Sequence, residues 1–236
     1  MREPYELYYW PMLPGRGEIV RMILEDAGVA YRDVAREEGI PAVVEARRGA
    51  LGGTKPFAPP VLKCGDLVLS QTAVIVRVLA ERHGLAPDDE VDRLLAQQHV
   101  LGWSDLMVEC HDTHHPIALR LTYEEQAEAA KERARHFRES RLGPWLTHFE
   151  GIVRSGGGVH VGGRICQADL MARLVVRGLA HAFPRAFAAL QPEIPGLLAL
   201  AERVEARPNL AAYLASDRAL SFNAHGIFRH YPELDA

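Results

Sequence analysis

The residues from Phe57 to Leu79 could form a small-molecule site that binds an anion through backbone groups. The stretch contains Pro59-Pro60 and reaches Ser70-Gln71-Thr72 directly before an apolar pattern with helical spacing. The first N–H groups of a helix lack partners, and the hydroxyl of Ser70 or Thr72 could accept from them. The same N–H groups would bind a carboxylate. On spacing alone, an ordinary capped helix is the alternative.

The double proline should give an irregular segment before the first apolar run. Proline has no N–H to donate, so Pro59-Pro60 is not expected inside a paired strand. An X–Pro bond adopts the cis form at a cost of roughly 0.5–1 kcal/mol. A bend here would turn backbone polar groups toward the helix start that follows.

A second candidate is the cluster His111-Asp112-Thr113-His114-His115-Pro116. His111 and His115 could share one helix face and ligate a metal, with Asp112 orienting one of them. However, Pro116 ends the helix at once, and cationic side chains suit a helix C-terminus. We therefore expect a helix-end cluster that lines a ligand pocket, and no metal.

Composition excludes several function classes. The chain has 236 residues, of which 48% are apolar and 25% charged, with a formal net charge of −4. No block of like charge favours nucleic acid or an anionic membrane as partner. No run is long enough to span a bilayer, and the amino terminus lacks an apolar signal core. Three widely spaced cysteines fit neither a disulfide framework nor a metal motif, so a cytoplasmic location is expected.

The pattern before Gly84 predicts an α/β domain. The order is strand, helix, strand, helix, hairpin and helix, which suggests a four-stranded sheet with helices on its faces. The expected strands are 5–10, 29–34, 61–62 and 67–69, and the expected helices are 17–26, 42–48 and 72–83.

After a linker at residues 86–89, the patterns predict only helices and a tail. They fall at 91–110, 123–141 with a bend at Gly143-Pro144 and continuation to Arg154, 169–181, 195–206 and 210–215. Residues 223–236 should form a tail laid over another surface. The chain therefore divides into an α/β domain, residues 1–84, and an all-helical domain, residues 90–236.

Four segments in this order resemble the cytosolic glutathione transferases, nearest to the tyrosine-type sigma, mu and pi classes. They are YELYYWPMLPGRGEIVRMIL, FAPPVLKCGDLVLSQTAVI, VGGRICQADLMARLVV and ERVEARPNLAAYLAS. The resemblance covers nearly the whole chain. It implies a thioredoxin-like α/β N-terminal domain, an all-α C-terminal domain, glutathione as co-substrate and a homodimer.

The resemblance implies that Tyr9 donates its hydroxyl to the glutathione sulfur. A thiol has a pKa of about 8.5, and only the thiolate attacks an electrophile. A hydrogen bond to a charged group contributes roughly 1.5–3 kcal/mol, which would lower the thiol pKa by about one to two units. A register shift of one residue would put Tyr8 there instead, and a strand tyrosine that merely packs is the remaining alternative. The loop after Tyr9 is one residue longer than the family's pattern.

The γ-glutamyl end of glutathione should bind Gln71 and Thr72, which match the family's Gln-Ser pair. The residue before the family's cis-proline, here Pro60, normally pairs both its N–H and its C=O with the cysteinyl backbone. Pro59 has no N–H, so one of these two bonds must be missing, at a loss of roughly 0.5–1.5 kcal/mol.

Three charged residues match the family's pattern more loosely. In the family, an arginine at the position of Arg16 lies beside the thiol. At the position of Arg48, the family has a basic residue that reaches the glycyl carboxylate. Asp105 lies in a helix from which the family extends an aspartate across the dimer interface toward the γ-glutamyl amine of glutathione, and a solvated helix acid is the alternative.

These residues predict a transferase that adds glutathione to an apolar electrophile. The electrophile should contact Trp10, Met12, His111 and His115. Two other functions stay open: a glutathione-dependent isomerase or peroxidase on the same scaffold, and a non-catalytic glutathione carrier. Cys166, in the segment Cys166-Gln167-Ala168-Asp169, replaces the hydroxyl of the family's capping box, which should reduce stability more than activity.

Overall fold

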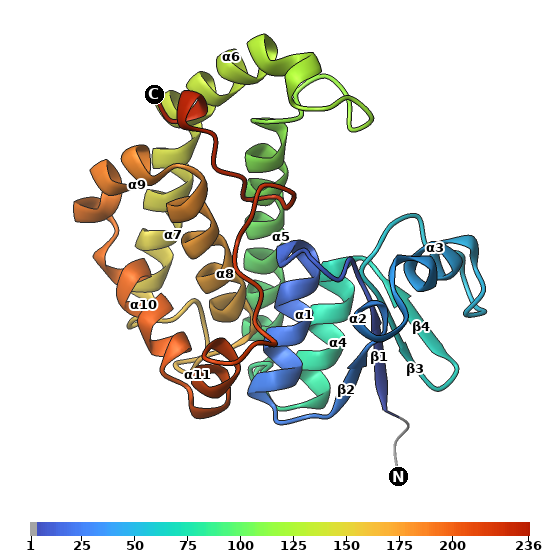
Figure 1. Ribbon diagram of the computed structural model, residues 1–236. Helices are drawn as coiled ribbons and strands as arrows, with labels where there is room; N and C mark the ends of the chain where they lie inside the picture. The colour runs from blue at the N-terminus through green and yellow to red at the C-terminus, as the bar shows by residue number, and fades with distance from the viewer. Residues whose placement is uncertain (1–3) are drawn as a thin grey trace. The chain divides into compact units, whose positions relative to one another are not determined.

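The chain forms two compact units in a computed structural model that describes residues 4–236 (Figure 1). Unit 1 comprises Met1–Ala86 and Ala206–Ser221, and unit 2 comprises Pro87–Glu205 and Phe222–Ala236. Residues 1–3, which begin the predicted first domain, lie outside the described residues. The predicted fold class, an α/β domain followed by helices, is confirmed.

Unit 1 is built on a four-stranded mixed sheet in the order β2-β1-β3-β4. Its strands are β1 (Tyr5–Tyr8), β2 (Tyr31–Asp33), β3 (Val61–Cys64) and β4 (Leu67–Ser70). β1 and β2 are parallel, whereas the β1–β3 and β3–β4 pairs are antiparallel. Tyr8 pairs with Val61, which in turn pairs with Ser70. The C-terminal ends of β1 and β4 and the start of β3 therefore meet at one end of the sheet.

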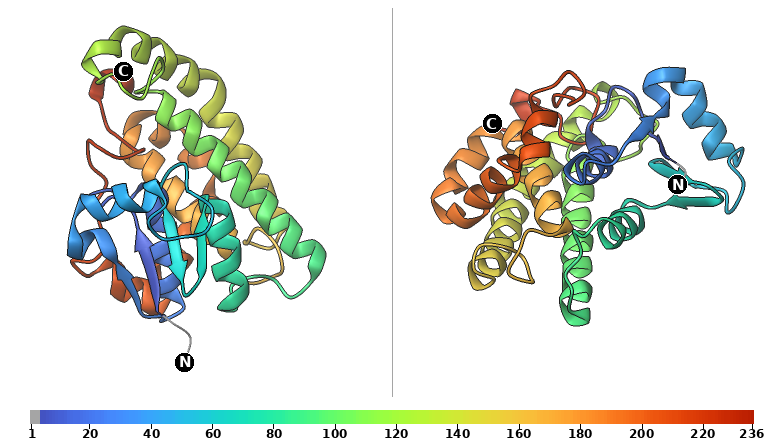
Figure 2. Two further views of the ribbon diagram at one scale, coloured as in Figure 1. Left: turned by 90° about the vertical axis from the view of Figure 1, so that its right-hand side faces the viewer. Right: turned by 90° about the horizontal axis from the view of Figure 1, so that it is seen from below.

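Helices cover both faces of this sheet (Figure 2). α1 (Gly15–Asp26) and α4 (Thr72–Arg82) pack together on one face, and α2 (Val34–Glu38) and α3 (Ile40–Arg48) lie on the other. The sequence predicted only the second of these short helices. Gly39, with φ 83°, separates the two, a backbone conformation that glycine adopts without a steric cost.

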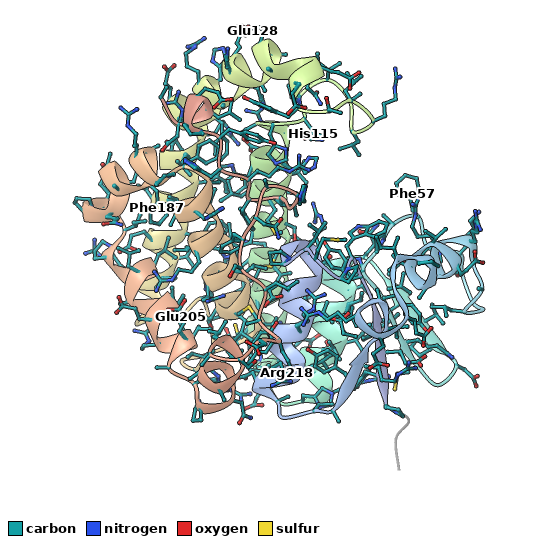
Figure 3. All side chains as sticks on the ribbon, in the orientation of Figure 1. Phe57, His115, Glu128, Phe187, Glu205 and Arg218 are labelled. Atoms are coloured by element: carbon teal, nitrogen blue, oxygen red, sulfur yellow. The ribbon has the colours of Figure 1, made fainter. Side chains whose placement is uncertain are left out.

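The segment 206–221, which the sequence analysis placed in the helical domain, groups with unit 1. It carries α11 (Pro208–Leu214), which packs on α1. Arg207 forms a bidentate ion pair with Asp26 at 2.5 and 2.7 Å, and Arg218, labelled in Figure 3, pairs with Glu25 at 2.5 Å. Charge pairs between residues this far apart in sequence have no local pattern, which is why spacing could not reveal them.

Unit 2 is helical throughout its described elements. These are α5 (Glu90–Asp112), η1 (Glu124–Gln126), α6 (Ala127–Phe137), η2 (Arg138–Leu142), α7 (Gly143–Ser155), α8 (Gln167–Ala182), α9 (Pro184–Leu190), η3 (Gln191–Glu193), α10 (Pro195–Glu205) and η4 (Pro232–Leu234). The sequence patterns did not predict α9. No helix within residues 4–236 is long and apolar enough to cross a membrane.

The bend predicted at Gly143-Pro144 takes a different form. The chain stays helical from Ala127 to Ser155, with a π-helical stretch, Arg138–Leu142, just before the proline. Proline offers no N–H and its ring collides with the carbonyl four residues earlier. The wider π turn absorbs that conflict, so the helix continues.

Buried carboxylates accept hydrogen bonds from backbone N–H groups at the starts of α8 and α10. Asp169 completes a capping box with Cys166, whose N–H donates to Asp169 Oδ2 at 2.7 Å. Glu150 accepts from the N–H groups of Gly196 and Leu197 at the start of α10. The capping box therefore forms with a thiol in place of the family's hydroxyl.

The C-terminal tail packs over unit 2, as predicted. Phe228 lies so close to Gly178 that a Cβ at that glycine would collide with its ring. Tyr123 stacks on Tyr231 with ring centroids 3.8 Å apart. Asp235 accepts from two N–H groups at the start of α9, so the last residues anchor a helix by the same means as Asp169.

Histidines buried in unit 2 should make the protein sensitive to mild acid. Burial is the largest cause that lowers the pKa of His114 to about 3, and those of His99 and His111 to about 4, from an ordinary 6.5. His114 is buried, and its Nε2 lies 2.9 Å from the carbonyl oxygen of Ile227 in the tail. The unfolded chain binds protons at these histidines more tightly than the folded protein does. The stability that the neutral histidines contribute to the folded protein is therefore complete above pH 6.5 and is lost as the pH falls.

We expect the melting temperature of the wild-type protein to fall between pH 7 and pH 5. The melting temperature of the His114→Gln variant should fall less over the same range. Each buried histidine adds a slope of at most about 1.4 kcal/mol per pH unit to the free energy of unfolding in this window. Thermal unfolding followed by circular dichroism measures the slope. His136, whose side chain is 55% exposed, provides the control variant His136→Gln. Equal slopes in both variants would contradict the assignment of the effect to His114.

Candidate functional site

Tyr9 lies just past the end of β1 and faces α1. Its side chain is 5% exposed, and its hydroxyl oxygen accepts from the Arg16 N–H at 3.0 Å. Arg16 is in the first turn of α1, where the helix N–H groups and the positive end of its dipole are found. The hydroxyl oxygen is thus held as an acceptor, so its proton can be donated to an anion.

Two glycines make this approach possible. A Cβ at Gly15 would lie 2.5 Å from the Tyr9 hydroxyl oxygen, and a Cβ at Gly17 would overlap the Tyr9 ring. Gly15 also has φ 25°, which favours glycine. The Gly15-Arg16-Gly17 segment is therefore a cradle shaped for the Tyr9 side chain.

Tyr8 points to the opposite face of the sheet. It packs with Val34, Ala46 and Val61 in the core beneath α2 and α3, and its hydroxyl donates to Glu6 at 3.2 Å. Burial, followed by the neighbouring Glu6 charge, raises the Tyr8 pKa to about 12. Side chains alternate along a strand, so adjacent tyrosines must face opposite sides.

Burial also raises the pKa of the Tyr9 hydroxyl, but its surroundings oppose that effect. The Arg16 N–H and the charges of Arg21 and Arg16 favour the ionised form. The carbon of the Arg21 guanidinium lies 5.7 Å from the centre of the Tyr9 ring. Tyr9 is thus the tyrosine at this end of the sheet whose neighbours favour negative charge on its oxygen.

The strand register places two further segments at this end of the sheet. Tyr8 pairs with Val61 and Val61 with Ser70, so the next residues along, Tyr9, Pro60 and Gln71, follow at the same end. The Pro59–Pro60 bond is cis, as the sequence predicted. Tyr9, the proline pair and the start of α4 form the candidate site.

The start of α4 differs from the predicted hydroxyl cap. Gln71 occupies the N-cap position with no side-chain cap, and its carbonyl accepts from the N–H groups of Val74 and Ile75. Gln71 is the one non-glycine residue with positive φ, 70°, among residues 4–236. Thr72 is buried and Gln71 exposed. Residues held in such a conformation cost roughly 1–3 kcal/mol and concentrate at ligand sites.

The remaining predicted residues lie on α3, in the loop after β1, or in unit 2. Arg48 is 70% exposed and pairs with Glu45 on the last turns of α3. Trp10 and Met12 belong to the loop after β1, and Phe57 projects into solvent from the loop before β3 (Figure 3). Asp105 is exposed on α5 in unit 2.

His111, His114 and His115 form a compact cluster at the end of α5, labelled by His115 in Figure 3. Their ring centroids are 4.9–5.2 Å apart, and burial lowers the pKa of each. The neutral form of all three imidazoles is therefore favoured, and His114 is buried whereas His111 and His115 are partly exposed. Within residues 4–236 no group of three or more metal-ligating side chains could hold a metal ion.

The charged groups behind Tyr9 were not predicted from the sequence. Arg21 is fully buried and bonds Asp33 and Glu18, and Glu18 accepts from the Tyr213 hydroxyl at 2.8 Å. Glu18 and Tyr213 are 195 residues apart. In the sequence, the charge of Arg21 within an apolar helix pattern was the only available signal.

Comparisons with known proteins agree with this architecture. Residues 111–217 match the family described as "Glutathione S-transferase, C-terminal domain". "Glutathione S-transferase P 2" of Bufo bufo is 30% identical over 222 residues, covering 90% of this chain and 93% of that protein. "Hematopoietic prostaglandin D synthase" of Gallus gallus is 29% identical over 211 residues, covering 89% and 94%. The structure of the pi-class glutathione S-transferase of Onchocerca volvulus has a TM-score of 0.69 and 21% identity, covering 89% of this chain and 91% of that one.

We expect Gly17→Ala to destabilise the protein by about 1–3 kcal/mol, because the added methyl group must displace the buried Tyr9 ring. Urea unfolding measures the loss. Gly151→Ala is the matched control, since a Cβ there meets nothing within 4 Å and alanine should raise helix stability by about 0.5–1 kcal/mol. A Gly17→Ala variant as stable as wild type would mean that Tyr9 does not occupy the cradle.

Proposed function

Because this chain belongs to the glutathione S-transferase family, we propose that it binds glutathione at the sheet end formed by Tyr9, Pro59-Pro60 and Gln71-Thr72. Tyr9 stabilises the glutathione thiolate, which then adds to an apolar electrophile. The observation that carries this proposal is the Tyr9 hydroxyl, held by the Arg16 N–H at 3.0 Å beside the ends of β3 and β4.

Tyr9 acts by donating its proton in a hydrogen bond to the sulfur. Its oxygen already accepts from the start of α1, which polarises the O–H bond. A charge-assisted hydrogen bond of roughly 1.5–3 kcal/mol lowers the thiol pKa by about one to two units. Arg16 adds positive charge nearby. The thiolate is then abundant at neutral pH and attacks the electrophile's carbon.

The two ends of glutathione bind to the flanking segments. The γ-glutamyl carboxylate meets the start of α4 at Gln71 and Thr72, where helix N–H groups favour an anion. The Pro59 carbonyl accepts from the cysteinyl N–H, and the bond that an N–H at this position would donate is absent. Arg48 reaches the glycyl carboxylate from α3 by leaving its exposed pair with Glu45. Such surface pairs contribute little stability.

A second candidate is a glutathione-dependent isomerase or peroxidase, which would use the same thiolate. The similarity to a prostaglandin D synthase supports it. The electrophile contacts predicted for Trp10, Met12, His111 and His115 apply to either reaction. No metal is required by either, and the three cysteines, which form no disulfide within residues 4–236, suit a cytoplasmic location.

The homodimer is proposed on the exposed face of α5. Val91, Leu94, Leu101 and Val108 are exposed apolar residues of this helix. Asp105 lies between the last two at helical spacing, so it shares their face. A second copy covering this face would bury the apolar residues and bring Asp105 to the partner, as the family's pattern implies.

Tyr9→Phe should raise the pKa of bound glutathione by about one to two units and slow conjugation of a generic aryl halide at pH 7 by about ten- to a hundredfold. The thiol pKa is read from the pH dependence of kcat/KM. Tyr8→Phe is the control, because its hydroxyl bonds Glu6 on the other face. Equal rates for wild type and Tyr9→Phe would remove Tyr9 from the mechanism. Bound glutathione without conjugation in either protein would favour the carrier function.

Leu101→Glu should convert the dimer to a monomer, because a charge would be buried in the contact. Light scattering coupled to size exclusion gives the mass. Ile117→Glu, an exposed apolar residue of unit 2 beyond α5, should leave the dimer intact. A wild-type monomer would refute the homodimer, and a dimeric Leu101→Glu would place the contact elsewhere.

A further inference from the structure

A buried group of charges lies behind Tyr9 and is separate from the residues that we propose to bind glutathione. Arg21 has no exposed surface, and its Nε donates to Asp33 Oδ2 at 2.7 Å. Its Nη1 donates to Glu18 Oε2 at 3.2 Å and to the Leu13 carbonyl at 3.1 Å. Buried charges are retained only when paired and hydrogen-bonded, so this arrangement keeps Arg21 ionised.

The position of Arg21 gives it an electrostatic effect on Tyr9. Its guanidinium carbon lies 5.7 Å from the Tyr9 ring centre, and both side chains are buried. Charges interact strongly at this distance in an environment that excludes water. The Nη2 nitrogen of Arg21 has no hydrogen-bond partner. Although Glu18 and Asp33 both pair with Arg21, the charge of Arg21 favours negative charge on the Tyr9 oxygen.

Glu18 and Tyr213 set how far that charge is compensated. Glu18 is 3% exposed, and burial raises its pKa while Arg21 and Tyr213 oppose the rise. The Tyr213 hydroxyl, from α11, donates to Glu18 Oε1 at 2.8 Å. The segment 206–221 therefore contributes directly to the charge balance behind Tyr9.

We propose that Arg21, Glu18 and Tyr213 are positioning residues for the glutathione thiolate and act through Tyr9. The positive charge of Arg21 makes the Tyr9 hydroxyl a stronger donor, Glu18 moderates that charge, and Tyr213 keeps Glu18 ionised. This inference rests on the proposed role of Tyr9 and extends it to the segment 206–221.

Other charged and titratable groups surround this network and must stay constant in any test. Asp33 also pairs with Arg36 at 3.0 Å, and the guanidinium of Arg218 lies 5.7 Å from the Tyr213 ring centre. Tyr31 donates to Glu25 at 3.0 Å, and Arg16 acts on Tyr9 directly. None of these residues is altered in the variants below.

The test is the sign of the shift in the thiol pKa of bound glutathione. Arg21→Met should raise it and Glu18→Gln should lower it, each by about 0.5–1 pH unit. Tyr213→Phe should lower the thiol pKa by less than Glu18→Gln does, because it weakens the charge of Glu18 without removing it. General loosening of the site can only move the pKa upward, toward that of free glutathione. A downward shift in Glu18→Gln, which is nearly isosteric, is therefore not expected from structural damage.

Arg21→Lys keeps the charge and should leave the thiol pKa near the wild-type value, even if stability falls. Circular dichroism and urea unfolding establish that each variant is folded. If Arg21→Met does not fold, the thiol pKa values of Arg21→Lys and Glu18→Gln still test the proposal. Upward or absent shifts in both Glu18→Gln and Tyr213→Phe would overturn the proposal.

The double variant Tyr9→Phe/Glu18→Gln separates this proposal from the proposed function. If the network acts through Tyr9, Glu18→Gln should have no further effect in the Tyr9→Phe background. A shift that persists there would overturn the network's action through Tyr9. If Tyr9→Phe alone leaves the thiol pKa unchanged, the role of Tyr9 fails and the network's role fails with it.

Discussion

The structure of unit 1 depends on the contact between the Tyr9 hydroxyl and the start of α1. A tyrosine at the end of β1 can reach the Arg16 N–H only because Gly15 and Gly17 have no side chains to obstruct its ring. The loop of residues 10–14 must therefore fold back on itself, and its length sets where α1 begins. Because α1 starts there, the charge of Arg21 lies behind the tyrosine ring.

The mixed sheet then assembles a site from segments that are distant in sequence. Antiparallel pairing of β1 with β3 and of β3 with β4 brings three chain reversals to one end. Tyr9, the proline pair and Gln71, with its positive φ, lie directly next to the paired residues at this end. We propose that glutathione, a tripeptide with charged ends and a thiol, binds along this end of the sheet.

Buried charge is used in both units, with different consequences. In unit 2, Asp169, Glu150 and Asp235 satisfy the starts of helices, which is a structural use. In unit 1, Glu18 and Arg21 compensate each other without capping a helix, directly behind the tyrosine that we propose as catalytic. Buried charged groups therefore stabilise helix starts in unit 2, and we propose that in unit 1 they set the electrostatics of the site.

The sequence by itself determined the fold class, the strand order along the chain, the cis-proline and the family, because these follow from local patterns and motif matches. Tertiary structure alone decided which tyrosine faces α1, since a one-residue register shift reverses every side chain of a strand. It also assigned the segment 206–221 to unit 1 and joined Tyr213 to Glu18 across 195 residues. Ion pairs and hydrogen bonds at such separations leave no periodicity in the chain, so only the folded arrangement reveals them.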